Sequence, residues 1–198
     1  ALTGGQWTAT LDRVATRTLE ITGRATGRLN ADDVSATTLG GNVRAVVDDL
    51  PAFLAELRAA GLVLADTSSL AGGRASLEIA LAGTVGAPSA TGVVDAGDLE
   101  IEGVGPGTLT AAFAADPAMV AVKTFDFSLA PNTMSGQVVI DLNAGTLQGA
   151  LTADLPRLSP LMAMLPPESR VEGAATLSAD IGGTLDAPAV QIVAGASD

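Results

Sequence analysis

The chain of 198 residues has no cysteine, no histidine and no tyrosine, and its only lysine is Lys123. Zinc fingers, disulfide scaffolds, cysteine nucleophiles and histidine-based triads are therefore excluded. The formal net charge is −12, whereas a protein that binds nucleic acid needs clustered Lys and Arg to contact phosphates. We expect no enzymatic activity, no metal, no cofactor and no nucleic-acid partner.

Long apolar runs are also missing. A membrane-spanning helix needs about 18 or more consecutive apolar residues, and the best candidate, residues 111–122, is interrupted by Asp116 and Pro117. The first residues show no basic stretch followed by an apolar run, so we expect no signal peptide. The chain is then either soluble as given or a piece of a longer protein.

Alternation of apolar and polar residues is the dominant pattern of the sequence. It runs through residues 18–29, 74–81 and 171–181, and shorter segments repeat it. A period of two is typical of strands with one buried and one solvated face, and clusters of Gly, Asn and Pro separate the segments. The sequence predicts an all-β fold with about ten strands.

Two segments break this alternation and predict short helices. The first covers residues 51–60, with Pro51 at its start and Gly61 past its end. The second covers residues 158–165 and is stopped by Pro166 and Pro167. Two short helices are too few to cover the apolar face of such a sheet.

That apolar face has to be covered in another way, because soluble monomers expose apolar patches of only a few hundred Å². Either the sheet folds onto itself as a sandwich with a dry core, or it curls into a groove whose contents come from outside. The aromatic content is only 3%, and many positions on the apolar side are Ala or Gly. Small residues favour the groove, since a dry sandwich fills its interior with large side chains.

An internal repeat organises the chain. Residues 77–88 (LEIALAGTVGAP) match residues 177–188 (LSADIGGTLDAP), 100 positions further along. The tripeptide Asp-Leu-Pro occurs at residues 49–51 and again at 154–156, before each predicted helix. Repeats of this kind predict an elongated protein in which each unit contacts mainly its neighbours.

The repeated Gly-Thr-x-x-Ala-Pro element, which ends an alternating strand and follows an Asp-Leu-Pro helix, resembles the repeats of the TamB and AsmA-like family. The resemblance covers residues 42–198 and divides the chain into three segments. Residues 1–41 are the strand end of a preceding repeat, residues 42–147 are one repeat unit, and residues 148–198 are the start of a second. The resemblance implies an elongated, curled sheet, a β-taco or half-pipe, of which this chain is an internal fragment.

The resemblance also implies a function and a location. Members of the family are large envelope proteins of diderm bacteria, anchored in the inner membrane and crossing the periplasm to an outer-membrane barrel of the TamA type. Their apolar groove is thought to carry phospholipid acyl chains, in support of outer-membrane biogenesis, protein assembly and secretion. For this chain we expect phospholipid acyl chains and neighbouring repeats of the same chain as partners.

The apolar residues of the alternating strands are the candidate lining of the groove. Acyl chains bind by displacing water, at about 0.8 kcal/mol per buried CH₂, and need a continuous apolar strip rather than a hydrogen-bonding residue. The predicted lining consists of Leu19, Ile21, Leu77, Ile79, Leu81, Leu99, Ile101, Phe125, Phe127, Val138, Ile140, Leu147, Leu151, Leu177, Ile181, Val190 and Ile192. The alternative interpretation of the same residues is a dry core, in a structural β-repeat stalk or adhesin-like spacer.

Lys123 stands out as a charged residue in an apolar segment. It is in phase with Phe125 and Phe127. We expect it either at the rim of the groove, where its amine meets a lipid phosphate, or at a strand edge, where it discourages edge-to-edge pairing.

Overall fold

The computed structural model describes residues 2–3, 5–62, 70–101, 105–158 and 173–197. The described strands are β1 (Leu2–Thr3), β2 (Gln6–Ala15), β3 (Leu19–Arg28), β4 (Thr38–Val47), β5 (Leu70–Gly83), β6 (Pro88–Ile101), β7 (Gly105–Ala115), β8 (Met119–Leu129), β9 (Asn132–Asp141), β10 (Thr146–Leu155), β11 (Ala174–Gly183) and β12 (Pro188–Ser197). An α-helix, α1 (Leu50–Ala59), follows β4, and a 3-10 turn, η1 (Val34–Ala36), precedes it.

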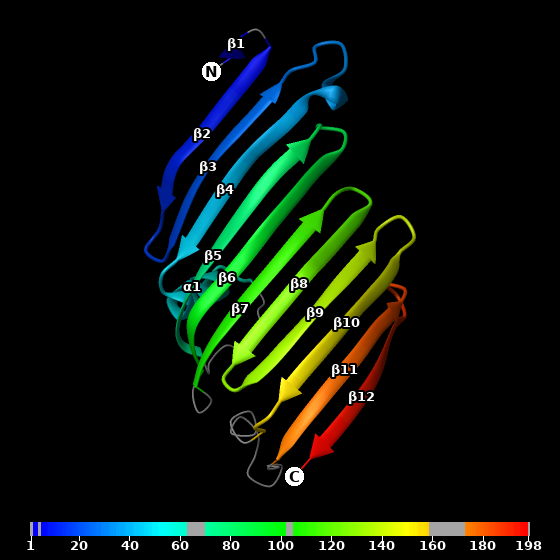
Figure 1. Cartoon of the computed structure of the whole chain (residues 1–198). Coiled ribbons are helices and arrows are strands. Elements are labelled where there is room, and N and C mark those ends of the chain that lie inside the picture. The colour runs from blue at the N-terminus through cyan, green and yellow to red at the C-terminus, as the bar shows by residue number, and fades with distance from the viewer. Residues whose placement is uncertain (1, 4, 63–69, 102–104, 159–172, 198) are drawn as a thin grey trace.

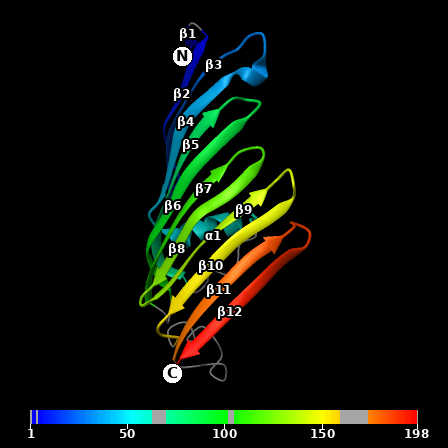
Figure 2. The same cartoon turned by 45° about the vertical axis from the view of Figure 1, so that its right-hand side comes forward.

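All of these strands form one antiparallel sheet of 12 strands, in the order in which they follow along the chain. Figure 1 shows them side by side in an elongated, curled ribbon that runs from β1 to β12. Figure 2 shows that the strand direction changes steadily along the ribbon, as expected for the natural twist of β-strands. The all-β fold predicted from the alternation is confirmed, and so is the elongated, curled sheet that the repeat and the resemblance implied.

No second β-layer packs on this sheet within the described part of the chain. Contacts between strands run mainly between neighbours in the sheet, and α1 contacts β5. The described strands therefore do not form a two-layer sandwich. In the described ranges, no helix is long and apolar enough to cross a membrane.

The first predicted helix is confirmed as α1. Asp49 is its N-cap, and the Asp49 carboxylate accepts a hydrogen bond from the backbone N–H of Ala52 at 3.0 Å. Pro51 lies in the first turn, where its missing N–H leaves no hydrogen bond unmade. The second predicted helix, at residues 158–165, falls almost entirely on residues 159–172, outside the described residues.

The two Gly-Thr-x-x-Ala-Pro elements form equivalent turns. In each, the backbones of the Thr and the Ala exchange hydrogen bonds, and the threonine hydroxyl accepts from the same alanine N–H. The residue after the threonine donates its backbone N–H to the loop just before a neighbouring strand, from Val85 to Thr37 and from Leu185 to Gly145. The repeat detected in the sequence thus has the same turn geometry in both copies.

The Asp-Leu-Pro tripeptides are not equivalent in the same way. Asp49 caps α1, whereas Asp154 and Leu155 lie inside β10 and pair with β11. The strand before the second tripeptide continues through residues whose counterparts in the first copy have already left the sheet. Both strands are ten residues long, and the equivalent bridges of Thr38 with Thr84 and of Thr146 with Thr184 align β4 with β10 at a spacing of 108 residues. The predicted correspondence between the two tripeptides, at a spacing of 105, is therefore wrong by three positions.

Candidate functional site

The strand register places the predicted lining on one face of the sheet, which we call the apolar face. Directly paired residues of neighbouring antiparallel strands share a face. One row of such pairs crosses the sheet from Ile21 in β3 to Ile192 in β12, through Ala45, Leu77, Val94, Ala111, Phe125, Gly136, Leu151 and Ala179. The same pairings put every predicted lining residue on this face: Leu19, Ile21, Leu77, Ile79, Leu81, Leu99, Ile101, Phe125, Phe127, Val138, Ile140, Leu147, Leu151, Leu177, Ile181, Val190 and Ile192. Their role in contacting acyl chains stays a prediction.

Bulges keep the apolar face continuous where the simple alternation fails. In β6 the register shifts between Ala96 and Leu99, and both residues still pair into the apolar face. Similar shifts occur in β2 and β8. An extra residue in one strand changes the phase of the alternation, so apolar residues on both sides of the bulge stay on the same face.

Glycines on the apolar face make room for large side chains of the next strand. The ring of Phe113 lies against Gly92, and the indole of Trp7 lies against Gly27. The Leu151 side chain lies against Gly136 in the same way. Neighbouring side chains therefore occupy the space that these glycines leave. Small residues on this face do not by themselves leave an empty channel, which corrects the sequence argument that they favour one.

Burial of the apolar face is deepest near one end of the strands. Val47, Leu99 and Leu129 have exposed fractions of 6%, 7% and 3%. All three lie near the end at which β4 leads into α1, and Figure 1 shows α1 beside this end. At β12 the exposed fractions rise to 57% for Val190 and 66% for Ile192. The apolar face is thus well covered at one end and open at the C-terminal edge.

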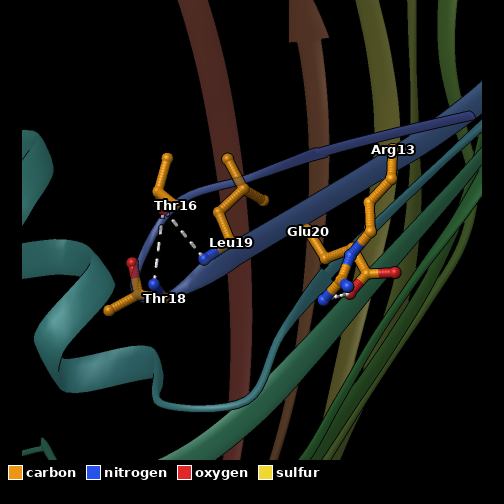
Figure 3. A network of polar contacts seen from close by, with 5 residues as sticks. All are labelled: Arg13, Thr16, Thr18, Leu19 and Glu20. Atoms are coloured by element: carbon orange, nitrogen blue, oxygen red, sulfur yellow. Dashed lines mark hydrogen bonds and ion pairs between the residues drawn. The ribbon is translucent and has the colours of Figure 1, made fainter. Parts of the chain in front are cut away.

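Polar contacts tie α1 to the turn between β2 and β3. The Thr18 hydroxyl, on a residue with an exposed fraction of 7%, donates to Glu56 Oε2 at 2.7 Å. Within the turn, Thr16 Oγ1 accepts from the backbone N–H groups of Thr18, at 3.3 Å, and Leu19, at 3.1 Å (Figure 3). The helix that contacts β5 is therefore also held by a side-chain hydrogen bond from the turn between β2 and β3.

The opposite face, which we call the polar face, carries charged and hydroxyl side chains. Arg44 Nε lies 3.5 Å from Glu78 Oε1 on the neighbouring strand. A second pair joins Arg13 and Glu20 at 2.7 Å (Figure 3). These side chains are exposed, and exposed ion pairs contribute at most about 1 kcal/mol each. The polar face is a solvated surface held together mainly by the sheet itself.

A hollow of about 700 Å³ lies largely on the polar face. Most of its lining residues, including Arg44, Glu78 and Lys123, belong to that face. Of the residues predicted to line the groove, only Ile79 borders this hollow. This hollow and the predicted lining therefore lie largely on opposite faces of the same strands.

Lys123 occupies neither of its predicted positions. It lies in β8, between β7 and β9, so it is not at a sheet edge. The register shift between Val122 and Phe125 leaves Lys123 and Thr124 opposite Gln137, on the polar face. Lys123 borders the hollow there instead of the rim of the apolar face. The rim prediction is wrong because the bulge breaks the phase between Lys123 and Phe125, and the edge prediction is wrong because β8 has a neighbouring strand on each side.

Part of the apolar face was missed by the sequence reasoning. Val43, Leu109 and Phe113 pair into this face as well. The signal was present for Leu109, which stands between Thr108 and Thr110, and Phe113 follows it in the same phase four residues later. Val43 likewise stands between the polar residues Asn42 and Arg44. It was missed because the preceding pair Gly40-Gly41 is typical of a turn.

In the described residues, no group of three or more potential metal ligands is placed to hold an ion. No protein-family model, curated protein or solved structure matches this chain. The function is therefore inferred from the sheet and its two faces.

Proposed function

We propose that the chain is a segment of an envelope-spanning protein of the TamB and AsmA-like kind, whose apolar face shields or conducts phospholipid acyl chains between inner and outer membranes. In this proposal the full-length protein is anchored in the inner membrane of a diderm bacterium and crosses the periplasm. Its outer-membrane partner is a barrel of the TamA type, and its role is in outer-membrane biogenesis and protein assembly or secretion.

The observation that carries the proposal is the continuity of the apolar face. The row from Ile21 to Ile192 crosses ten neighbouring strands with no charged side chain in it, and no second described β-layer covers it. Contact between an acyl chain and such a row is worth about 0.8 kcal/mol per CH₂ removed from water. Because this contact has no preferred direction, an acyl chain can move from strand to strand without breaking a hydrogen bond.

The sharpest test asks which face touches the acyl chain. The purified chain is mixed with phosphatidylethanolamine vesicles that contain a phospholipid with a photoreactive group near the end of one acyl chain. After irradiation, peptide mass spectrometry locates the attachment sites. We expect attachment at Leu77, Ile79 and Phe125. Attachment concentrated at Arg44 and Lys123, around the polar-face hollow, would contradict the proposal, and so would an absence of attachment.

Two neighbouring substitutions in β5 provide a matched pair. Ile79→Asp places a carboxylate on the apolar face, whereas Ala80→Asp adds the same charge to the polar face. We expect Ile79→Asp to reduce photolabelling about tenfold, because an acyl chain cannot hydrate the new carboxylate, and Ala80→Asp to leave it nearly unchanged. Circular dichroism should show both variants folded. Unfolding of Ile79→Asp alone would indicate a dry core and support the stalk interpretation.

A further inference from the structure

A β-bulge places Lys123, the only lysine of the chain, on the polar face of the sheet. In β8, Val122 lies opposite Phe113 of β7. Thr124 lies opposite Ala112, the adjacent residue of β7, so Lys123 is an extra residue in this strand pair. The register with β9 shifts at the same point. Bulges redirect side chains and are over-represented beside functional sites, and this one directs Lys123 to the hollow of about 700 Å³.

The Lys123 ammonium group has no anionic partner among the described residues. The other charged residues that line the hollow are Arg44 and Glu78, which lie 3.5 Å apart and compensate each other. The hollow therefore has one excess positive charge, in a chain whose net charge is −12. A local excess of one sign of charge in a concave surface attracts ligands of the opposite sign.

The part of the hollow next to Lys123 is lined by short apolar side chains. On the polar face of β5, β6 and β7 these are Ala80, Val93 and Ala112. Small-molecule sites commonly measure about 300–1,000 Å³ and combine an apolar lining with a few polar groups that fix the orientation of the ligand. The backbones of β4 and β8 are four strand spacings apart, about 19 Å. A compact ligand at Lys123 therefore covers Ala112 and Val93 without reaching Arg44.

We propose that this hollow binds a compact organic anion, a molecule with one carboxylate or phosphate group on an apolar body. The anionic group accepts hydrogen bonds from the Lys123 ammonium group, and the body lies over Ala112 and Val93. Arg44 compensates Glu78, which would otherwise repel the ligand. This site does not depend on the acyl-chain role of the apolar face, because the two sites lie on opposite faces of the sheet.

Lys123 also borders a second, smaller hollow of about 330 Å³ on the polar face, toward β9 and β10. That hollow contains Asp126, whose carboxylate has no cationic partner among the described residues. The charge of Asp126 offsets that of Lys123 there and repels an anion. The larger hollow is the better anion site, since its carboxylate, Glu78, already has a cation beside it.

The single lysine permits a direct test by NMR. Protein made with ¹³C-labelled lysine gives one lysine side-chain Cε signal, from Lys123. The probes are 2-naphthoate and 2-naphthyl phosphate. The matched controls are 2-naphthol, which has the same body without the charge at neutral pH, and acetate, which has the charge without the body.

The titrations are run in about 0.15 M salt, where the Debye length is about 8 Å and the net charge of the chain is largely screened. We expect a saturable shift of the Lys123 signal with at least one naphthyl anion, at a concentration at least about tenfold lower than with 2-naphthol or acetate. The tighter of the two anions identifies the head group as carboxylate or phosphate. No saturable shift with either anion, or equal shifts with the controls, would overturn the proposal.

Variants of the cation separate a specific contact from net charge, with the affinity for the tighter anion measured by calorimetry. Lys123→Gln should weaken binding about tenfold, because it removes a charge-assisted hydrogen bond, and Lys123→Arg should retain most of the affinity. Arg17→Gln makes the same change of net charge in the turn between β2 and β3 and should have no effect. Equal losses in the two glutamine variants would overturn the proposal.

A second pair of variants distinguishes the two hollows. Ala112→Leu fills part of the larger hollow and should reduce the affinity at least as much as Lys123→Gln does. Ala150→Leu is the matched control, because Ala150 lies on the same face and lines the smaller hollow. Circular dichroism should show both variants folded. A loss of affinity in Ala150→Leu equal to or greater than that in Ala112→Leu would contradict the assignment of the anion to the larger hollow.

Discussion

The two faces of this sheet use the same strands but differ in how closely their side chains fit. On the apolar face, large side chains lie against glycines of the next strand, as Phe113 does against Gly92. On the polar face, Arg44 and Glu78 approach to only 3.5 Å, with side-chain exposed fractions of 61% and 64%. Shape complementarity is thus concentrated on one face. Substitutions that add volume should therefore lower the free energy of unfolding on the apolar face and leave it nearly unchanged on the polar face.

The largest effect is expected for a methyl group added to the apolar face. In Gly92→Ala the new Cβ would collide with the Phe113 ring and would lie 2.6 Å from the backbone oxygen of Glu78. Because that oxygen belongs to the sheet, relief requires a shift of the backbone. We expect the free energy of unfolding to fall by about 1–3 kcal/mol, measured by urea denaturation.

Gly182→Ala is the matched control on the polar face. Nothing lies within 4 Å of a Cβ built at Gly182, and Gly182 pairs with Ala189 on the face opposite to Ile181. Replacing a glycine in an extended strand restricts the unfolded chain, so we expect no loss or a gain of up to about 1 kcal/mol. Equal losses of unfolding free energy in Gly92→Ala and Gly182→Ala would show that the two faces do not differ in how closely their side chains fit.

Much of this two-face arrangement can be predicted from alternation, because a strand turns successive side chains to opposite sides. Leu77 and Ile79 flank Glu78 in the sequence, and in the sheet Glu78 pairs with Arg44 on the other face. Pro51 predicts the start of α1 for an equally local reason, since the fixed φ of proline suits the first turn of a helix. These predictions succeed where a few adjacent residues determine the backbone.

Predictions that depend on pairing between distant segments were wrong or incomplete. The bulge at Lys123 arises because β8 has an extra residue relative to β9, and the sequence of β8 alone does not reveal the length of its partner. Asp154 likewise lies in the sheet because it pairs with Thr176 of β11, and the residues around the tripeptide do not reveal this pairing. The hollow is lined by residues of six strands, from β3 to β8, so no single segment of the sequence encodes its location.

An intermediate effect on stability is expected where α1 packs against β5. Asp49→Ala removes the carboxylate that accepts the Ala52 N–H and should cost about 1 kcal/mol. Hydrogen exchange should increase in α1 and at the adjoining end of β4, with little change at the far ends of the strands. Asp154→Ala is the matched control, because the same tripeptide lies in a strand there and caps no helix. A global, uniform increase in exchange would argue against a local role for α1.

The smallest effect is expected at Asp33, an exposed residue in the loop before η1. The Ser35 hydroxyl donates to Asp33 Oδ1 at 2.6 Å, and the Ser35 backbone N–H donates to the same oxygen at 2.9 Å. These bonds favour the charged carboxylate and lower the pKa of Asp33 from its ordinary value. A carboxyl with a lowered pKa in the folded state stabilises the fold above its unfolded pKa, near 3.9, and that contribution is lost as the pH falls through the folded pKa.

Thermal melting of the wild type and Asp33→Asn should therefore differ slightly near neutral pH and converge in acid. The Ser35 backbone oxygen also accepts the N–H of Gly86 at 2.8 Å. The loss of stability in Asp33→Asn should therefore affect the turn between β5 and β6 first. Asp32→Asn, with the same charge change on the neighbouring residue, controls for net charge. A difference that grows toward acid pH would reverse the sign of the argument. A loss larger than that of Gly92→Ala would mean that exposed polar contacts, rather than the fit of the apolar face, hold this sheet together.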